Sequence, residues 1–125
     1  MIKIIFCLRK LEHLSETEFQ DYWSGVHGPL VAQHAQAMGV VKYVQCRPVV
    51  GRLNKLVGIS RGAPTPYDGV AEIYFESIDS LIEATSTEEG SNAEATLRAD
   101  EANFIDFAQS PFFIVELHEL FNAGT

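Results

Sequence analysis

The residues best suited to chemistry lie in one short stretch, YWSGVHGPL, at positions 22–30. It carries a histidine, His27, four residues after the chain's only tryptophan, Trp23. An imidazole titrates near neutral pH, so a histidine held beside an aromatic wall is suited to proton transfer with an apolar substrate. The pattern also fits a histidine that only satisfies backbone groups at a helix end. Both interpretations stay open on local pattern alone.

A proline places this histidine at an interruption of a helix. Ser15 and Glu18 form a capping box, a typical helix start, and apolar residues then recur every three or four positions. Pro29 cannot donate a hydrogen bond to the carbonyl four residues earlier, and its ring collides with that carbonyl. The helix is therefore expected to bend or stop near Gly28 and to restart at the proline. We expect two helices end to end, with His27 at the joint and its ring aimed into an enclosed pocket.

A second ionisable candidate lies on an expected strand. In GVAEIYFES, residues 69–77, Glu72 alternates onto the same side as Tyr74. If that side faces a cavity, loss of water would raise the pKa of the carboxyl and make Glu72 a partner for His27. Otherwise it is an ordinary strand carboxylate at an interface.

Other reactive arrangements are missing from the sequence. His13, His34 and His118 have no metal-ligand spacing, although Glu116 and His118 share one side of an expected strand. The chain has no glycine-rich phosphate loop, no nucleotide fingerprint and no serine nucleophile motif. We therefore predict neither a metal nor an organic cofactor.

Composition favours a soluble globular domain over residues 1–125. The chain is 46% hydrophobic and 21% charged, a length and composition that suit one core. A net charge of −8 argues against nucleic acids and anionic membranes as partners. The first apolar run is too short for a signal peptide or a membrane span, and Cys7 and Cys46 have no metal spacing. We expect a cytoplasmic protein with reduced thiols.

Charge is distributed unevenly along the chain. No Asp or Glu occurs between Tyr22 and Tyr67, whereas Lys42, Arg47, Arg52, Lys55 and Arg61 fall in that interval. This basic segment is either a solvated surface that balances the acidic second half or a patch that steers an anionic substrate.

The elements that must position these residues follow the order β, α, β, β, α, β. Strands are expected over 2–8, 39–50, 69–77 and 112–120, and helices over 15–34 and 79–108, the second in two pieces separated by the polar residues 85–92. Four glycines and two prolines in residues 51–69 predict a long loop, either functional, an oligomer arm or poorly ordered. This order predicts an α+β, ferredoxin-like fold with an antiparallel sheet and both helices on one face.

The other face of that sheet also needs a cover. We expect Tyr43 and Gln45 to lie there together with Glu72 and Tyr74, a mixture too apolar for open water and too polar for a dry core. Pairing two such sheets face to face in a homodimer would cover this face and leave a lined cavity.

Four stretches follow one another over nearly the whole chain: Tyr22-Trp23-x-x-x-His27-Gly28-Pro29-Leu30, Tyr43-Val44-Gln45, Tyr67-Asp68-Gly69-Val70-Ala71-Glu72 and Asp100-Glu101-x-x-Phe104. Together, and in this order, they resemble the EthD domain family of dimeric α+β barrel proteins. EthD itself accompanies an ether-degrading monooxygenase system, and similar fungal proteins are described as dehydratases in aromatic polyketide pathways. A related barrel enzyme isomerises methylated muconolactones with a histidine and a tyrosine at positions that correspond to His27 and Tyr43. The resemblance thus favours a catalytic His27.

Together these observations predict a cofactor-free lyase or isomerase that dehydrates, isomerises or cyclises a small cyclic or aromatic metabolite in catabolic or polyketide-type metabolism. His27 would be the acid or base, Tyr43 would donate a hydrogen bond to a substrate oxygen, and Glu72 would orient the site or move a second proton. The expected substrate-binding residues are Trp23, Gln45, Tyr74 and Phe104. The alternatives are a non-catalytic protein that binds or delivers a hydrophobic compound to an oxygenase, and a cofactor-independent monooxygenase.

Overall fold

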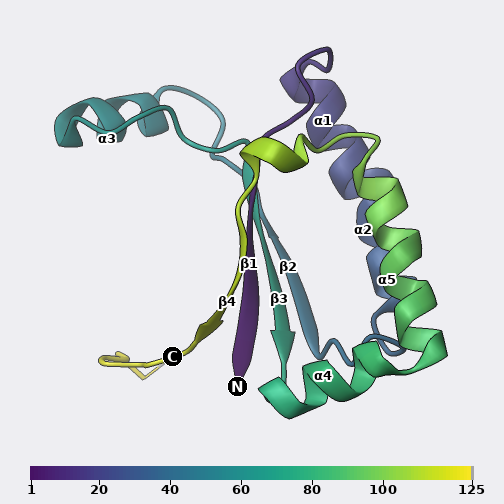
Figure 1. The fold of residues 1–125 in the computed structure, drawn as a ribbon. Helices are drawn as coiled ribbons and strands as arrows, with labels where there is room; N and C mark the ends of the chain where they lie inside the picture. The colour runs from purple at the N-terminus through teal and green to yellow at the C-terminus, as the bar shows by residue number, and fades with distance from the viewer. Residues whose placement is uncertain (125) are drawn as a thin grey trace.

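A four-stranded antiparallel sheet carries a layer of helices on one face (Figure 1). The computed structural model describes residues 1–124. In chain order the elements are β1 (Ile2–Leu8), α1 (Glu16–Tyr22), a π-helical turn (Trp23–His27), α2 (Gly28–His34), β2 (Lys42–Cys46), α3 (Leu53–Arg61), β3 (Gly69–Phe75), α4 (Ile78–Ser86), α5 (Glu88–Glu101), a 3₁₀ turn (Phe107–Gln109) and β4 (Phe112–Glu116). The strand order is β2-β3-β1-β4. This confirms the predicted α+β, ferredoxin-like arrangement.

Strand β1 shows which face of the sheet is buried. Ile2, Ile4, Phe6 and Leu8 are each at most 6% exposed, whereas the residues between them are half-buried. Since side chains alternate along a strand, the first set points to the helices and the second set to the open face. The helix-facing side therefore carries the core.

The first helix begins as expected and then continues through the proline. Ser15 Oγ accepts a hydrogen bond from the Glu18 N–H, and the Glu18 carboxylate accepts one from the Ser15 N–H. The backbone then stays right-handed and helical through a π turn, in which the Gly28 N–H donates to the carbonyl of Trp23, five residues earlier. This wider turn gives the ring of Pro29 room that a regular turn lacks. The predicted two helical segments with His27 at their junction are therefore present, but a π turn joins them where a bend or stop of the helix was expected.

Aromatic rings fill the core between this helix and the sheet. The ring of Phe19 packs edge to face against Trp23, with centroids 5.8 Å apart, and against Phe104, at 5.6 Å. A Cβ atom on Gly69 would lie 2.5 Å from the indole ring of Trp23, so the indole packs directly on the backbone at the start of β3. Trp23 is 1% exposed, which makes it a core residue as well as a wall of the cavity described below.

Two elements end earlier than the sequence predicts. The β4 strand stops at Glu116 rather than at residue 120, because Glu116 pairs with Ile2 and β1 offers no earlier residue of the strand to pair with. The β2 strand is also shorter, over Lys42–Cys46 rather than residues 39–50. Conversely, the break between α4 and α5 is confined to Thr87, whose hydroxyl caps α5, so most of residues 85–92 are helical.

The expected sharing of faces between β2 and β3 was wrong. Tyr43 pairs with Ile73, and Gln45 pairs with Ala71, which is 3% exposed. Directly paired residues lie on the same face of a sheet, so Tyr43 and Gln45 face the helices. Alternation along a single strand separates two sets of residues, but it does not show which set meets the core. Here the Gln45 amide donates to the carbonyl of Trp23 in the helix layer and to the hydroxyl of Tyr43 on its own strand.

The segment expected to be a long loop contains a helix. Within residues 51–69, α3 spans Leu53–Arg61 and ends at Gly62, whose φ of 63° is left-handed. In Figure 1, α3 stands away from the sheet, on the side opposite to α2 and α5. Among residues 1–124, no helix is both long and apolar enough to cross a bilayer.

Candidate active site

His27 lies in the π turn with its ring between two carboxylates. The residue is 3% exposed. Its Nδ1 lies 2.8 Å from Oδ2 of Asp100, a hydrogen bond, and its Nε2 lies 3.6 Å from Oε2 of Glu101, an ion-pair distance. Both carboxylates come from the last turn of α5, which packs beside the π turn. The ring is thus fixed by a residue 73 positions further along the chain.

Asp100 is itself held by further hydrogen bonds. The Tyr22 hydroxyl donates to its Oδ1 at 2.5 Å, and the Asn103 amide donates to that hydroxyl at 3.2 Å. Burial raises the pKa of Asp100, but the hydrogen bonds from Tyr22 and His27 lower it by more, so the pKa lies below its ordinary value. Asp100 is therefore a carboxylate near neutral pH, and it accepts the proton on Nδ1 of His27.

The surroundings of His27 favour its charged form. Burial of the imidazole lowers its pKa, but Glu101 and Asp100 together raise it by more, and the net pKa lies above the ordinary 6.5. The ring therefore keeps its proton on Nε2 to a higher pH than an ordinary imidazole does. Since Nδ1 is engaged by Asp100, the exchangeable proton is the one on Nε2.

A cavity of about 380 Å³ opens next to this nitrogen. It lies between the helix-facing side of the sheet and helices α2, α4 and α5. Its lining is mostly apolar and includes Phe6, Trp23, Tyr43, Ile73, Leu97 and Phe112. His27 and Glu101 also line it, whereas Asp100 is not among the described lining residues. Nε2 is therefore the ring nitrogen on the cavity side.

The charged groups of the cavity gather near one end. A smaller recess of about 250 Å³ shares Phe6, Glu94, Arg98, Glu101 and Phe112 with it. Arg98 pairs with Glu94 one turn away on α5, and its side chain is 69% exposed. Solvent therefore reaches this end of the cavity, and lining residues elsewhere, such as Ile82 and Ile114, are also more than half exposed.

These residues lie inside a recognisable domain. The family model of the EthD domain matches residues 11–108. The chain belongs to the EthD domain family. The matched range of this EthD domain contains His27, Asp100 and Glu101, whereas β1 and β4 lie outside it.

Solved structures share the fold at low sequence identity. An EthD family protein from Bacillus halodurans has a TM-score of 0.63 and 19% identity, covering 94% of this chain and 99% of its own. A dimeric protein of unknown function with a ferredoxin-like fold, from Bacteroides fragilis, has a TM-score of 0.57 and 10% identity, covering 93% and 95%. SnoaB, a cofactor-independent oxygenase from Streptomyces nogalater, has a TM-score of 0.53 and 13% identity, covering 94% and 93%. A comparison with curated proteins found no match.

Within this EthD domain, three of the predicted site residues line the cavity: Trp23, His27 and Tyr43. Gln45 lies behind them, where its Nε2 donates to the carbonyl of Trp23 at 2.8 Å and to the hydroxyl of Tyr43 at 3.0 Å. Phe104 is fully buried beneath the imidazole, with ring centroids 5.0 Å apart. The predicted substrate contacts Gln45 and Phe104 thus support the site from behind.

Glu72 and Tyr74 lie on the other face of the sheet, so the expected pairing of Glu72 with His27 was wrong. Lys3 donates to the Glu72 carboxylate at 2.7 Å. This hydrogen bond lowers the pKa of Glu72, whereas a position facing a cavity was expected to raise it. The Lys3 ammonium also lies 5.1 Å from the centroid of the Tyr74 ring.

Sequence reasoning missed Asp100 and Glu101 as functional residues, although they stand in one of the resembling stretches. The sequence did contain a signal for Glu101. Leu97, Glu101 and Phe104 follow the spacing i, i+4, i+7, so Glu101 lies on the core-facing stripe of α5, where an unpaired acid is costly. A carboxylate on an apolar stripe indicates a buried cationic partner, and His27 is that partner.

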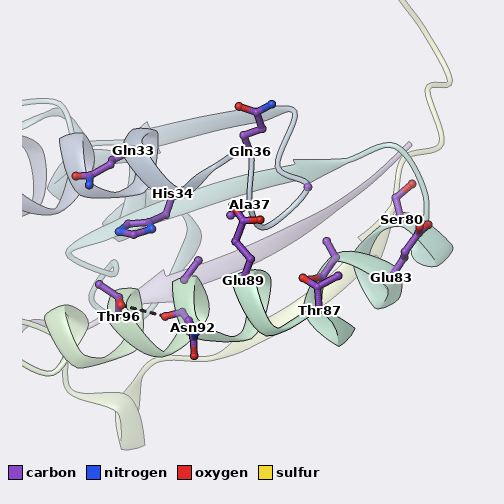
Figure 2. Close-up of a pocket in the computed structure, with 13 residues that line it drawn as sticks. Gln33, His34, Gln36, Ala37, Ser80, Glu83, Thr87, Glu89, Asn92 and Thr96 are labelled. Atoms are coloured by element: carbon purple, nitrogen blue, oxygen red, sulfur yellow. Dashed lines mark hydrogen bonds between the residues drawn. The ribbon is translucent and has the colours of Figure 1, made fainter.

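A second depression of about 840 Å³ lies apart from the cavity, between the end of α2 and helices α4 and α5. Figure 2 shows its lining side chains, which include His34, Glu83, Glu89 and Asn92. It is polar and open to solvent, and His34 has no carboxylate partner among the described contacts. Within residues 1–124, no group of three potential ligands could hold a metal ion, there or elsewhere.

Proposed function

We propose that this EthD-domain protein is a cofactor-independent lyase or isomerase that dehydrates, isomerises or cyclises a small cyclic or aromatic metabolite, in catabolic or polyketide-type metabolism. The observation that supports it is the position of His27, with Asp100 on one ring nitrogen and Glu101 and the cavity on the other. A titratable group of fixed orientation at the edge of an apolar cavity is what general acid-base catalysis requires.

The two groups that face the cavity divide the proton transfers between them. For a dehydration, Nε2–H of His27 gives its proton to the leaving hydroxyl, which departs as water, while the Glu101 carboxylate takes a proton from the adjacent carbon. That proton can return to Nε2 across the 3.6 Å that separate the two groups, which resets the site. Asp100 keeps Nδ1 protonated and the ring in place throughout, as a positioning residue.

Tyr43 supplies a hydrogen-bond donor to the substrate. Burial raises the pKa of its phenol, so the hydroxyl keeps its proton. The hydroxyl oxygen already accepts a hydrogen bond from Gln45, which leaves the proton free for a substrate oxygen. At the polar end the lining acids are each paired with a base, Glu94 with Arg98 and Glu101 with His27, so the lining carries little net charge.

The test is turnover by the purified protein and by a matched pair of histidine variants. Hydroxylated aromatic compounds and lactones are incubated in D₂O and followed by mass spectrometry for loss of water, isomerisation or deuterium uptake. We expect His27→Ala to lower turnover by about 10²- to 10⁴-fold without loss of binding. His34→Ala, in the second depression between α2, α4 and α5, should leave turnover unchanged. Equal activity in wild type and His27→Ala would falsify the assignment.

A second candidate is a cofactor-independent monooxygenase, favoured by the fold shared with SnoaB. In that case oxygen uptake accompanies turnover and an electron-rich phenol is consumed. An oxygen electrode separates the two activities, since dehydration and isomerisation consume no oxygen. Binding without turnover by the wild type would leave the third alternative, a non-catalytic carrier for an oxygenase.

We further propose that the protein is a homodimer joined through the open face of the sheet and acts in the cytoplasm, where the free thiols of Cys7 and Cys46 stay reduced. This face carries apolar side chains that no helix covers, among them Ile5, Val44, Val70 and Phe113. The similar protein from Bacteroides fragilis is described as dimeric.

Sedimentation equilibrium tests the dimer. Val70→Asp places a charge on the open face, between Cys7 and Cys46, and should yield monomers. Val26→Asp, the same substitution at a 48% exposed position of the helix layer, is the matched control and should remain dimeric.

A further inference from the structure

The segment between β2 and β3 projects from the molecule with its apolar side chains uncovered. We call residues 47–66 the arm. Against the rest of residues 1–124, no residue of α3 is buried. Leu53, Leu56 and Val57, which lie about one turn apart on one side of this helix, are each more than half exposed. Ile59 is 67% exposed and Val50 is 98% exposed. A helix of nine residues is not stable alone in water, so the structure requires a cover for this face.

The base of the arm is fastened, so its direction is set. The Arg9 guanidinium donates to the carbonyl of Pro66 at 2.6 Å and to that of Thr65 at 3.1 Å, and it stacks over the ring of Tyr67. At the other side of the base, Arg47 donates to the side chain of Gln20 on α1. The arm is thereby held out on the open side of the sheet (Figure 1).

The end of the chain is a second uncovered segment. We call residues 117–124 the tail; it follows β4. Leu120 is 95% exposed, Phe121 is 85% exposed and Leu117 is 45% exposed. The tail leaves the sheet on the same side as the arm but at the opposite end of the strands (Figure 1). Within one copy of the chain the arm and the tail are therefore too far apart to meet.

The charges of the two segments are complementary. The arm carries Arg47, Arg52, Lys55 and Arg61 and no acidic residue, a net charge of +4. Since the whole chain has a net charge of −8, the remainder carries −8 − 4 = −12. The tail and the last residue of β4 contribute Glu119 and Glu116 to it. A second copy of this chain therefore offers the arm an acidic surface, and the tail adds uncovered leucine and phenylalanine side chains.

We propose that the arm of each subunit packs on the tail of the partner subunit. The proposal rests on the homodimer proposed above. When two sheets stack across their open faces about a two-fold axis that lies in the interface and runs obliquely to the strands, the arm at the β2-β3 edge of one sheet lies over the tail at the β4 edge of the other. Both clasps then form by symmetry, because a two-fold interface repeats each contact. Leu53, Leu56 and Val57 cover the apolar side chains of the tail, and Lys55 and Arg61 face Glu116 and Glu119.

Cysteine cross-linking tests this contact in the full-length protein. In a Cys7→Ser, Cys46→Ser background, we expect Leu56→Cys combined with Leu120→Cys to give a covalent dimer on mild oxidation. Each single variant, and Leu56→Cys combined with Ile78→Cys on the helix side, should give much less. If the wild type sediments as a dimer and the Leu56–Leu120 pair does not cross-link above these controls, the clasp is wrong and the dimer stands. A monomeric wild type overturns both.

Charge reversal gives an independent measurement. Lys55→Glu with Arg61→Glu should weaken the dimer by about ten-fold, and Glu116→Lys with Glu119→Lys should restore it in the combined variant. The circular dichroism spectrum shows whether each variant is folded. If the combined variant instead forms a still weaker dimer than either charge-reversal variant alone, the arm packs on another part of the partner.

Discussion

The side chains around His27 and those of the arm differ in whether a single chain provides the environment that they require. Around His27, charged groups that would be costly alone are buried together, and each finds a partner within one chain. On the arm, leucine and valine side chains that gain from burial are left in solvent. One chain thus contains His27, both of its carboxylate partners and the cavity, whereas the apolar side chains of the arm would be covered only in the dimer proposed above.

The energetic consequence is that the two regions should respond differently to the same kind of truncation. Polar groups at the site are interdependent, because removing one leaves another buried without a partner. Apolar groups on the arm are independent of the monomer fold. Mutations can therefore separate folding, catalysis and assembly.

The largest effect is expected for truncation in the core beside the site. Trp23→Ala should lower the free energy of unfolding by about 3–5 kcal/mol, because the indole is buried against Phe19 and the backbone of Gly69. Leu56→Ala on the arm should change it by no more than about 0.5 kcal/mol at a concentration where the protein is monomeric. Urea denaturation followed by circular dichroism measures both. Equal losses would mean that the arm belongs to the folded core.

A smaller but more specific effect is expected at Asp100. Asp100→Asn keeps the shape but removes the charge that holds the proton on Nδ1, so the pKa of His27 should fall and stability should drop by about 1–3 kcal/mol. The pKa is measured by NMR titration of the imidazole. Asp21→Asn, on the exposed side of α1, is the control and should leave the His27 pKa where it was. An unchanged pKa in Asp100→Asn would show that Asp100 does not set the charge of the ring.

The same contrast explains what the sequence could and could not predict. Alternation and capping located β1, the start of α1 and the order of elements, because these signals are local. Asp100 and Glu101 were missed because they lie 73 and 74 residues from their partner His27. Glu72 was placed at the site because its face depends on strand pairing, which alternation along one strand does not show. The helix in the arm was missed because glycines and prolines normally predict loops. The features that the sequence did not predict depend on contacts between distant segments and not on local propensity.

Stability should also depend on pH through His27. Burial lowers its pKa, but Glu101 and Asp100 raise it by more, so the pKa is higher in the folded state than the 6.5 of the ordinary imidazole. This stabilises the fold fully below pH 6.5, and the contribution is lost as the pH rises through the raised pKa. The unfolding free energy of wild type minus that of His27→Gln should therefore shrink from pH 6 towards pH 9. A difference that grows over this range would show that the imidazole is neutral in the folded protein.

The smallest effect is expected where the sequence analysis placed a catalytic carboxylate. Glu72 pairs with Lys3 at the open face, and the two side chains remain 21% and 18% exposed, so Glu72→Gln should cost only about 0–1 kcal/mol of stability. Its turnover should equal that of the wild type, because Glu72 lies across the sheet from His27. Glu101→Gln, the same change on the cavity side, should lower turnover and the pKa of His27 together. If instead Glu72→Gln lost activity while remaining dimeric, the reaction would take place between the two sheets, and the cavity beside His27 would not be the active site.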